Sequence, residues 1–189
     1  MPKNYQMIHD ENLCIGCQAC SVSCRSENGV PDDVFRLQVH IETTGIFPEL
    51  KMDFKRQSCV MCENPPCVHV CPTGASFQTF DGLVHIDSDL CVACKYCMVA
   101  CPYDARFINP ITKAVEKCTF CFSNRVSKGL DPACVAVCPT DALVFGDMND
   151  KTSEVYKMSQ KKFLLKPKAH KGTQPRLSFV PNKKGGDHE

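Results

Sequence analysis

The number and spacing of the cysteines constrain this chain more than any other feature. All 16 cysteines of the 189-residue chain fall into four sets of four, and none is left over. In chain order, the sets are Cys14-Cys17-Cys20-Cys24, Cys59-Cys62-Cys67-Cys71, Cys91-Cys94-Cys97-Cys101 and Cys118-Cys121-Cys134-Cys138. The third set reads C-x2-C-x2-C-x3-C-P, a spacing that holds cubane 4Fe–4S clusters through thiolates. The sequence therefore predicts four 4Fe–4S clusters and a protein that transfers electrons.

Three other uses of cysteine compete with this interpretation. Disulfides are typical of secreted proteins, but residues 1–5 lack the apolar core of a signal peptide. Zinc sites also use C-x2-C pairs, yet they usually join two separated pairs, whereas the first and third sets crowd three cysteines together. Redox-active C-x2-C dithiols would not need four such sets. A zinc-bound interaction module is therefore the remote alternative.

The formal net charge of the chain is +1 before any cofactor is counted. An oxidised cubane with four thiolates carries about −2, so four of them bring the protein to about −7. This charge argues against nucleic-acid binding, although the C-terminal tail is locally basic. No apolar run approaches the length that spans a bilayer, so at a membrane another subunit must hold this chain.

An internal repeat follows the cysteines. Three sets close with Cys-Pro, an alanine and a strand-like run, which is Ser76–Thr79, Arg106–Ile108 or Leu143–Phe145. The first set has Arg25 in place of the proline. We expect short helices to carry the third and fourth cysteine of each set, for example over 97–101. Asp81-Gly82 between two β-rich runs predicts a hairpin, and Asn109–Thr112 predicts a turn. This repeat predicts two copies of the two-cluster ferredoxin unit.

The predicted fold class is α+β, with two ferredoxin-like 2×(4Fe–4S) modules in one compact unit over residues 1–146. The outer module comprises residues 1–24 and 107–146, and the inner module comprises residues 59–106. In a two-cluster ferredoxin the fourth cysteine of each set ligates the other cluster. The short link between the second and third sets favours their pairing, which leaves the first set to the fourth. Spacing alone does not fix this exchange.

Two segments lie outside the repeat. Residues 25–58 contain two alternating runs, 36–42 and 50–55, separated by a break over 43–48. They predict an inserted β-hairpin with one buried face. Residues 147–189 predict an extended C-terminal tail that begins with a short helix near 153–162. Its apolar spots suggest that the tail drapes over partner subunits, and its last residues are expected to be solvated.

The order of the four spacings resembles the four-cluster iron–sulfur subunits of respiratory molybdenum enzymes. Within that family, the chain is most similar to the subunits of polysulfide and thiosulfate reductases. Besides the x4 gap of the second set and the x12 gap of the fourth, the matching stretches are 7–20, 101–106, 131–135 and 180–186. The resemblance covers nearly the whole chain.

The resemblance implies a ligand set for each cluster. The cluster nearest a catalytic subunit would take Cys14, Cys17, Cys20 and Cys138, and the second would take Cys24, Cys118, Cys121 and Cys134. The third would take Cys59, Cys62, Cys67 and Cys101, and the cluster nearest a membrane subunit would take Cys71, Cys91, Cys94 and Cys97.

The same resemblance implies a non-catalytic electron-transfer subunit in anaerobic respiration. Electrons would pass from a quinol-oxidising integral membrane subunit to a molybdopterin-containing catalytic subunit that reduces polysulfide or thiosulfate. The expected location is the periplasmic face of the bacterial cytoplasmic membrane, after co-export with the catalytic subunit; the alternative is cytoplasmic. Alternative complexes are those for dimethyl sulfoxide, tetrathionate, formate or hydrogen.

Two further residues invite a functional interpretation. Lys95, inside the third set, could raise the potential of its cluster by its charge, and a solvated lysine is the competing interpretation. His69, between Cys67 and Cys71, could tune its cluster, but a surface histidine is favoured. The sequence contains no nucleophile–base pair, phosphate-binding glycine loop or second metal motif, so no catalytic residue is predicted.

Overall fold

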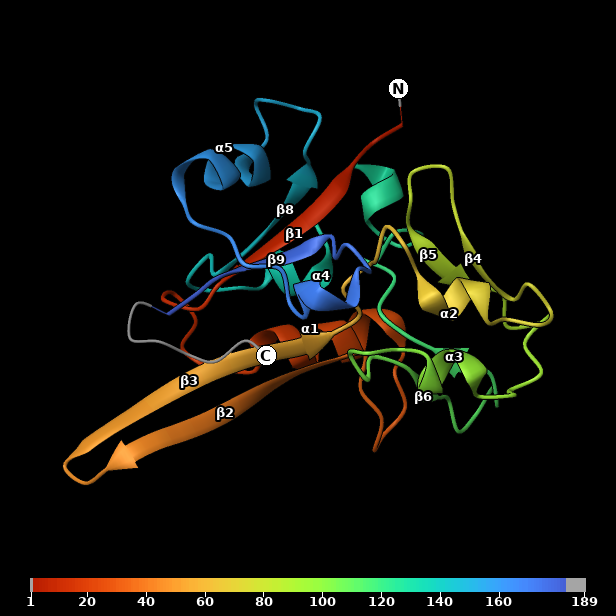
Figure 1. Cartoon of the computed structure of the whole chain (residues 1–189), viewed down its shortest axis with the longest axis horizontal. Coiled ribbons are helices and arrows are strands. Elements are labelled where there is room, and N and C mark those ends of the chain that lie inside the picture. Colours follow the sequence, from red (N-terminus) through yellow and green to blue (C-terminus); the bar gives the residue numbers. More distant parts are fainter. Residues whose placement is uncertain (1, 183–189) are drawn as a thin grey trace.

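The computed structural model describes residues 2–182 (Figure 1). The strands are β1 (Tyr5–Asp10), β2 (Leu37–Ile46), β3 (Glu49–Ser58), β4 (Ser76–Gln78), β5 (Val84–Ile86), β6 (Phe107–Ile108), β7 (Val115–Glu116), β8 (Leu143–Asp147) and β9 (Leu177–Val180). The helices are α1 (Ala19–Asn28), α2 (Pro66–His69), α3 (Tyr96–Val99), α4 (Ala133–Ala136) and α5 (Glu154–Lys161), with 3-10 turns at Val126–Lys128 and Ala169–Lys171. This mixture of short helices and strands agrees with the predicted α+β class.

A three-stranded sheet joins the two ends of the described chain. Its strand order is β8-β1-β9, with β8 antiparallel and β9 parallel to β1. Helix α5 covers this sheet, and its fully buried Val155 packs with Ile8 and Val180. The side-chain oxygen of Ser153 caps the helix by accepting from the Tyr156 N–H at 3.3 Å.

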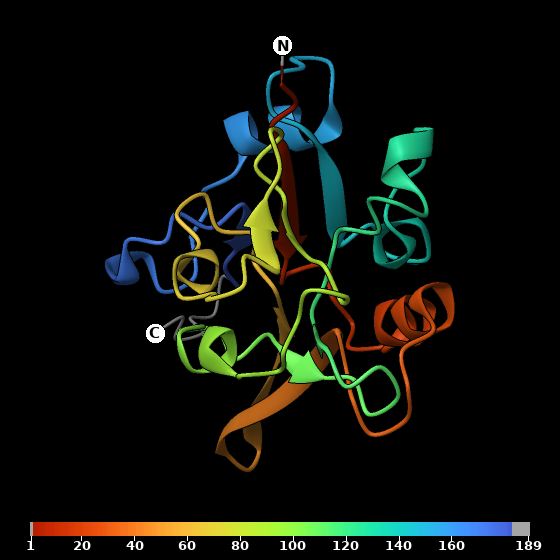
Figure 2. The same ribbon diagram turned by 90° about the vertical axis from the view of Figure 1, so that its right-hand side faces the viewer.

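The rest of the body consists of short paired elements between the cysteine loops. Helix α1 packs on α4 and α2 packs on α3, and Figure 2 shows the latter pair side by side in yellow and green. Strands β4 and β5 pair across the Asp81-Gly82 turn, which confirms the predicted hairpin. Strands β6 and β7 pair across 109–112, which confirms the predicted turn. The core contains buried apolar side chains such as Met61 and Leu83 together with several cysteines.

The prediction that each short helix carries two cysteines is wrong for three of the four sets. Helices α2, α3 and α4 contain the third cysteine and end before the fourth. A proline follows the fourth cysteine in each of these sets, and proline disfavours the helical conformation of the residue before it. Arg25 takes that place in the first set, so α1 continues through Cys24 to Asn28 and ends at Gly29 with φ 55°.

The hairpin of residues 37–58 differs from its prediction in burial. Its two ten-residue strands pair from Leu37–Ser58 out to Ile46–Glu49, so the predicted break over 43–48 shrinks to a turn at Phe47-Pro48. Only the base of the hairpin is buried, while Ile46 and Phe47 are 86% and 84% exposed. One buried face is therefore wrong for the outer half, because that half extends beyond the body of the molecule (Figure 1).

The described end of the C-terminal segment is a strand packed on its own chain rather than an extended tail. Residues 177–180 form β9, which is buried in the sheet beside β1. The Arg176 N–H donates to the Val60 carbonyl at 2.9 Å, and the Glu63 N–H donates to the Gln174 carbonyl at 2.9 Å. The segment packs within its own subunit, since β1 offers it an edge. The predicted solvated end, including residues 183–186, lies outside the described residues.

Within residues 2–182, the helices are all too short or too polar to cross a membrane.

We predict that Leu177→Ala destabilises the fold by about 2–5 kcal/mol, the usual cost of truncating a buried leucine. Leu177 is 1% exposed and belongs to the main core. The measurement is the midpoint of anaerobic denaturation followed by circular dichroism. Phe163→Ala is the control, since Phe163 is 72% exposed and should change the midpoint little. Equal midpoints for Leu177→Ala and the unaltered protein would contradict a structural role for β9.

Candidate iron–sulfur centres

Three cavities are each lined by four cysteines that come from two different sets. The Cys14 group is Cys14, Cys17, Cys20 and Cys138. The Cys24 group is Cys24, Cys118, Cys121 and Cys134. The Cys59 group is Cys59, Cys62, Cys67 and Cys101. In each group, three cysteines come from one set and the fourth from another set far away in the sequence.

Direct contacts tie the Cys24 group together. The side-chain amide of Asn28 lies 3.7 Å from Cys24 Sγ and 3.6 Å from Cys121 Sγ. The Phe120 N–H donates to Cys118 Sγ at 3.4 Å. The packing of α1 on α4 brings the first and fourth sets to the same place.

The four remaining cysteines, Cys71, Cys91, Cys94 and Cys97, are called the Cys71 group below. The Ser76 N–H donates to Cys71 Sγ at 3.3 Å, and the Val115 N–H donates to Cys91 Sγ at 3.5 Å. Cys97 contacts the Arg106 guanidinium, which also donates to Ser76 Oγ at 3.0 Å. A short series of hydrogen bonds therefore connects Cys71 with Cys97.

The cysteine loops reverse direction through left-handed residues at matching places. Gly16 and Gln18 have φ of 67° and 63° in the first set, and Ala93 and Lys95 have φ of 52° and 67° in the third. At Gly16 a Cβ would meet the Phe54 ring at 2.4 Å, so only glycine fits between this loop and the hairpin.

The four cysteine groups differ in how far their cysteines are exposed to solvent. Of the sixteen cysteines, all of which lie in the described part of the chain, only Cys17 and Cys94 are exposed. Cys17 belongs to the Cys14 group and Cys94 to the Cys71 group. All four members of the Cys24 group are buried. Two groups thus reach the surface, and one is enclosed.

The buried cysteines are better suited to bind iron than to remain as free thiolates. Burial raises the pKa of Cys62 and of Cys134 to about 12, and it also raises the pKa of Cys24. Such thiols stay protonated at neutral pH unless a metal displaces the proton. Among residues 2–182, no three or more Cys, His, Asp or Glu side chains are placed to hold a single metal ion. The cysteines of the Cys14, Cys24 and Cys59 groups line a cavity instead, as a cubane with an iron at every ligand requires.

Three buried cations lie among the cysteine groups, and the sequence analysis missed all three. Arg56 lines both the Cys14 and the Cys24 cavity, and Arg106 lines the Cys59 cavity. Lys117 is 2% exposed and lies beside Cys118. Within residues 2–182, Arg56 Nε and Nη2 and Arg106 Nη1 are buried without a hydrogen-bond partner. Buried N–H groups need acceptors, and the sulfides and thiolates of a cluster would supply them.

Neither of the tuning residues considered from the sequence is buried. Lys95 is an exposed residue at the left-handed position before α3, and His69 is exposed at the end of α2. Solvent screens both charges. The competing surface interpretation is therefore favoured for each.

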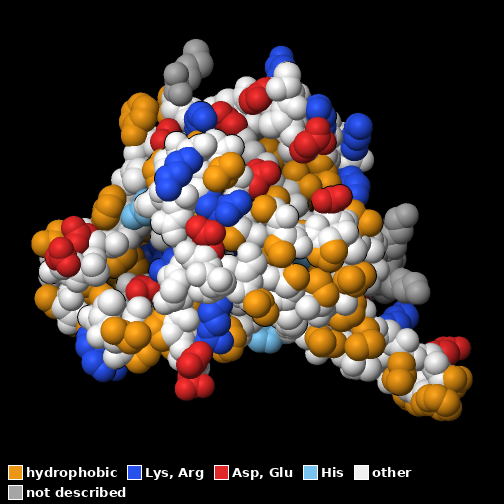
Figure 3. All heavy atoms as spheres, turned by 180° about the vertical axis from the view of Figure 1, so that it is seen from behind, with side chains coloured by type: hydrophobic (Ala, Val, Ile, Leu, Met, Phe, Trp, Pro, Cys, Tyr) orange, Lys and Arg blue, Asp and Glu red, His pale blue; other side chains and the backbone are white. Residues whose placement is uncertain are grey.

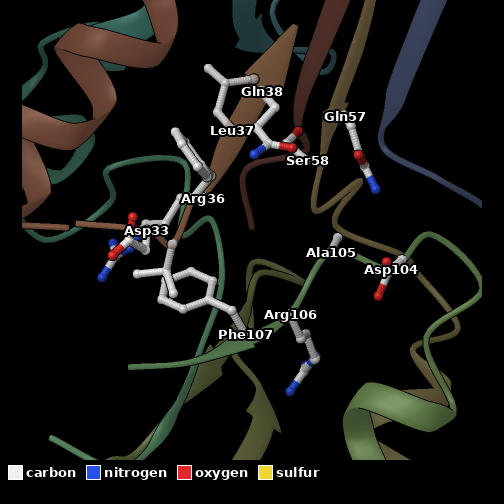
Figure 4. A pocket seen from close by; sticks show the side chains of 12 residues that line it. Asp33, Arg36, Leu37, Gln38, Gln57, Ser58, Asp104, Ala105, Arg106 and Phe107 are labelled. Atoms are coloured by element: carbon white, nitrogen blue, oxygen red, sulfur yellow. The ribbon is translucent and has the colours of Figure 1, made fainter. Parts of the chain in front are cut away.

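One cavity of about 230 Å³ contains no cysteine (Figure 4). It lies between the base of the hairpin and residues 104–107, and hairpin residues such as Leu37 and Ser58 line one side. In Figure 4 the Arg106 side chain extends away from these hairpin residues. Its guanidinium is thereby directed to Ser76 and Cys97 rather than to the hairpin.

Comparison with known proteins identifies the family. A family model described as a 4Fe-4S dicluster domain matches residues 50–148, and a second model of that description matches residues 13–75. The B subunit of polysulfide reductase from Wolinella succinogenes is 56% identical over 188 residues, 98% of each sequence. Protein NrfC of Escherichia coli is 49% identical over 96% of this sequence and 82% of its own. The thiosulfate reductase electron transfer subunit PhsB of Salmonella typhi is 44% identical, covering 91% and 90%.

This protein belongs to the 4Fe–4S dicluster family. It is a non-catalytic iron–sulfur subunit that transfers electrons in a respiratory reductase. Two dicluster matches and sixteen cysteines correspond to four 4Fe–4S clusters, so the predicted cofactors are confirmed. The names of the polysulfide and thiosulfate reductase relatives designate subunits, which implies that these relatives work in complexes with other subunits.

We predict that removing the clusters from this subunit unfolds it. Four-residue helices are not stable alone, so their geometry depends on cysteine–iron bonds. Ferricyanide and a chelator, added anaerobically, should abolish the iron–sulfur absorbance and the circular dichroism of the fold together. A protein that lost its iron and acid-labile sulfide but kept its folded spectrum would contradict this. Purified protein that held zinc instead would contradict the cofactor itself.

Proposed function

We propose that this subunit carries electrons from a quinol-oxidising membrane subunit to a molybdopterin-containing catalytic subunit that reduces polysulfide or thiosulfate. When bound, each 4Fe–4S cluster accepts and returns one electron. Electrons enter at the Cys71 group and leave at the Cys14 group. The observation that carries the proposal is that the two exposed cysteines, Cys94 and Cys17, belong to these two groups.

The proposed ligand sets are the four cysteine groups. Three of them line one cavity each, which supports the exchange of the fourth cysteine between sets. The exchange pairs the first set with the fourth and the second set with the third. The packing of α1 on α4 and of α2 on α3 supports the division into an outer and an inner module.

The order of the four groups is supported by side chains that adjoin two groups at once. Arg56 lines the cavities of the Cys14 and Cys24 groups. Lys117 donates to the Cys118 carbonyl at 2.8 Å and also to the carbonyl of Val84, which lines the Cys59 cavity. Arg106 lines the Cys59 cavity and contacts Cys97. These contacts support the order Cys71 group, Cys59 group, Cys24 group, Cys14 group.

Exposed apolar side chains near both exposed cysteines support two docking surfaces. Val92, Tyr96 and Val99 are exposed around Cys94, and Ile15 and Val22 are exposed around Cys17. The outer half of the hairpin is also apolar, with the side chains at its far end at the lower right of Figure 3. We assign the surface around Cys94 to the membrane subunit. The surface around Cys17 faces the catalytic subunit.

The terminal acceptor is proposed from the relatives whose names specify polysulfide reductase and thiosulfate reductase. A complex for another acceptor is the second candidate, since the similarly related NrfC has a name that specifies no substrate. We place the subunit at the periplasmic face of the cytoplasmic membrane, co-exported with its catalytic partner.

Deleting this subunit should abolish polysulfide and thiosulfate reduction by a menaquinol analogue in anaerobic spheroplasts. Reduction by dithionite-reduced viologen should persist, because the artificial donor reaches the catalytic subunit directly. Protease added outside the spheroplasts should digest the subunit, as the periplasmic location requires. Unchanged quinol-driven reduction would contradict the function, and full protection from protease in intact spheroplasts would contradict the location.

Serine substitutions test the ligand sets. Cys20→Ser and Cys138→Ser should alter the same cluster signal in electron paramagnetic resonance, although 118 positions separate them. Cys24→Ser should alter a different signal, although it lies four residues from Cys20. The three variants are matched in chemistry, so they differ only in the cluster they affect. Loss of the same signal in Cys20→Ser and Cys24→Ser would refute the exchange.

A further inference from the structure

Three cations are buried in the interior of a subunit that binds strongly negative cofactors. Each is enclosed: Arg56 and Arg106 are buried, and Lys117 is among the largest fully buried side chains. A buried charge without a partner is costly, so its presence needs a compensating charge close by. The carboxylate salt bridges recorded among residues 2–182 involve none of the three.

Each cation adjoins two neighbouring cysteine groups. Arg56 adjoins the Cys14 and Cys24 groups, since it lines both cavities. Its Nη1 donates to Ser58 Oγ at 2.6 Å, and its Nε and Nη2 have no hydrogen-bond partner among the described residues. Lys117 lies between the Cys24 and Cys59 groups, and its ammonium donates to the carbonyls of Cys118 and Val84. Burial lowers its pKa, while the thiolates of Cys59 and Cys118 oppose that shift.

Arg106 completes the series between the Cys59 and Cys71 groups. It lines the Cys59 cavity, contacts Cys97, and donates to Ser76, whose own N–H donates to Cys71. Burial alone would lower the pKa of Arg106, but the thiolates of Cys67, Cys97 and Cys59 raise it above its usual value.

We propose that Arg56, Lys117 and Arg106 tune the reduction potentials of the clusters. One buried cation lies between each pair of successive clusters and raises the reduction potentials of both. This inference rests on the ligand sets and the order of clusters given above. Each electron that arrives makes a cluster more negative by one charge. A cation held in a low-dielectric interior stabilises that reduced form more than the oxidised one.

The attraction of each electron to a shared cation also offsets the repulsion between electrons on neighbouring clusters. When one cluster is reduced, its extra charge makes reduction of the next cluster harder. Because the cation lies between the two, it favours an electron on either side. The series therefore keeps successive clusters accessible to electrons even though the whole protein is strongly negative.

The test is a redox titration of the complete complex, followed by electron paramagnetic resonance. Arg56→Gln should lower the potentials of the clusters of the Cys14 and Cys24 groups, and Lys117→Met those of the Cys24 and Cys59 groups. Arg106→Gln should lower those of the Cys59 and Cys71 groups. The expected change is at least tenfold in the ratio of reduced to oxidised cluster at fixed potential, which is about 59 mV for one electron.

Charge-conserving variants separate electrostatics from shape. Arg56→Lys, Arg106→Lys and Lys117→Arg should keep the potentials within a fewfold change of the original ratio. If a neutral variant loses its clusters, the cluster potentials of the charge-conserving variant at that position are compared with those of the unaltered complex instead. Lys95→Gln is the control, because it removes a cation that is close to Cys94 but exposed. Its effect should be much smaller than tenfold.

Two results would overturn the proposal. One is a neutral variant that keeps all four clusters at unchanged potentials. The other is a charge-conserving variant whose cluster potentials change as much as those of the neutral variant, or which loses its clusters as the neutral variant does. Failure of the proposed function would look different. It would appear as fewer than four clusters, or as no electron delivery between quinol and acceptor, in the unaltered complex.

Discussion

Ligation of iron by cysteine thiolates is the interaction on which the rest of this structure depends. Helices of four residues and strands of two or three have little stability of their own. They are held because three cavities each bring together cysteines from two sets that are separated in sequence. Cluster binding therefore does for this protein what a large hydrocarbon core does in others, and the apolar side chains fill the spaces between cofactors.

The same dependence explains the unusual distribution of charge. An interior that holds several negative clusters can also hold arginine and lysine, which are otherwise almost never fully buried. Arg56, Lys117 and Arg106 are buried where thiolates surround them rather than where carboxylates do. His85 illustrates the opposite case: burial and then the charge of Lys117 lower its pKa to about 4, so it stays neutral near physiological pH.

The parts of the molecule that sequence could predict are those with a local signal. The cysteine spacing, Asp81-Gly82 and the alternation around residues 36–55 each act within a few residues. They correctly indicated the cofactors, one small hairpin and the long hairpin. The buried cations have no such signal, because Arg56 continues an alternating strand and Lys117 simply precedes a cysteine. Leu177–Val180 looked like part of a tail because its partner strand, β1, lies at the other end of the sequence.

The pairing of β1 with β9 also bears on how the protein is made. During synthesis β1 emerges first, but its partners β8 and β9 follow only after residues 143 and 177. Likewise, Cys14, Cys17 and Cys20 leave the ribosome well over a hundred residues before Cys138 joins them. The first cysteines therefore have to stay reduced and uncommitted until Cys138 has been made. A truncated product that lacks β9 leaves one edge of β1 unpaired, and an unpaired strand edge can pair with another chain.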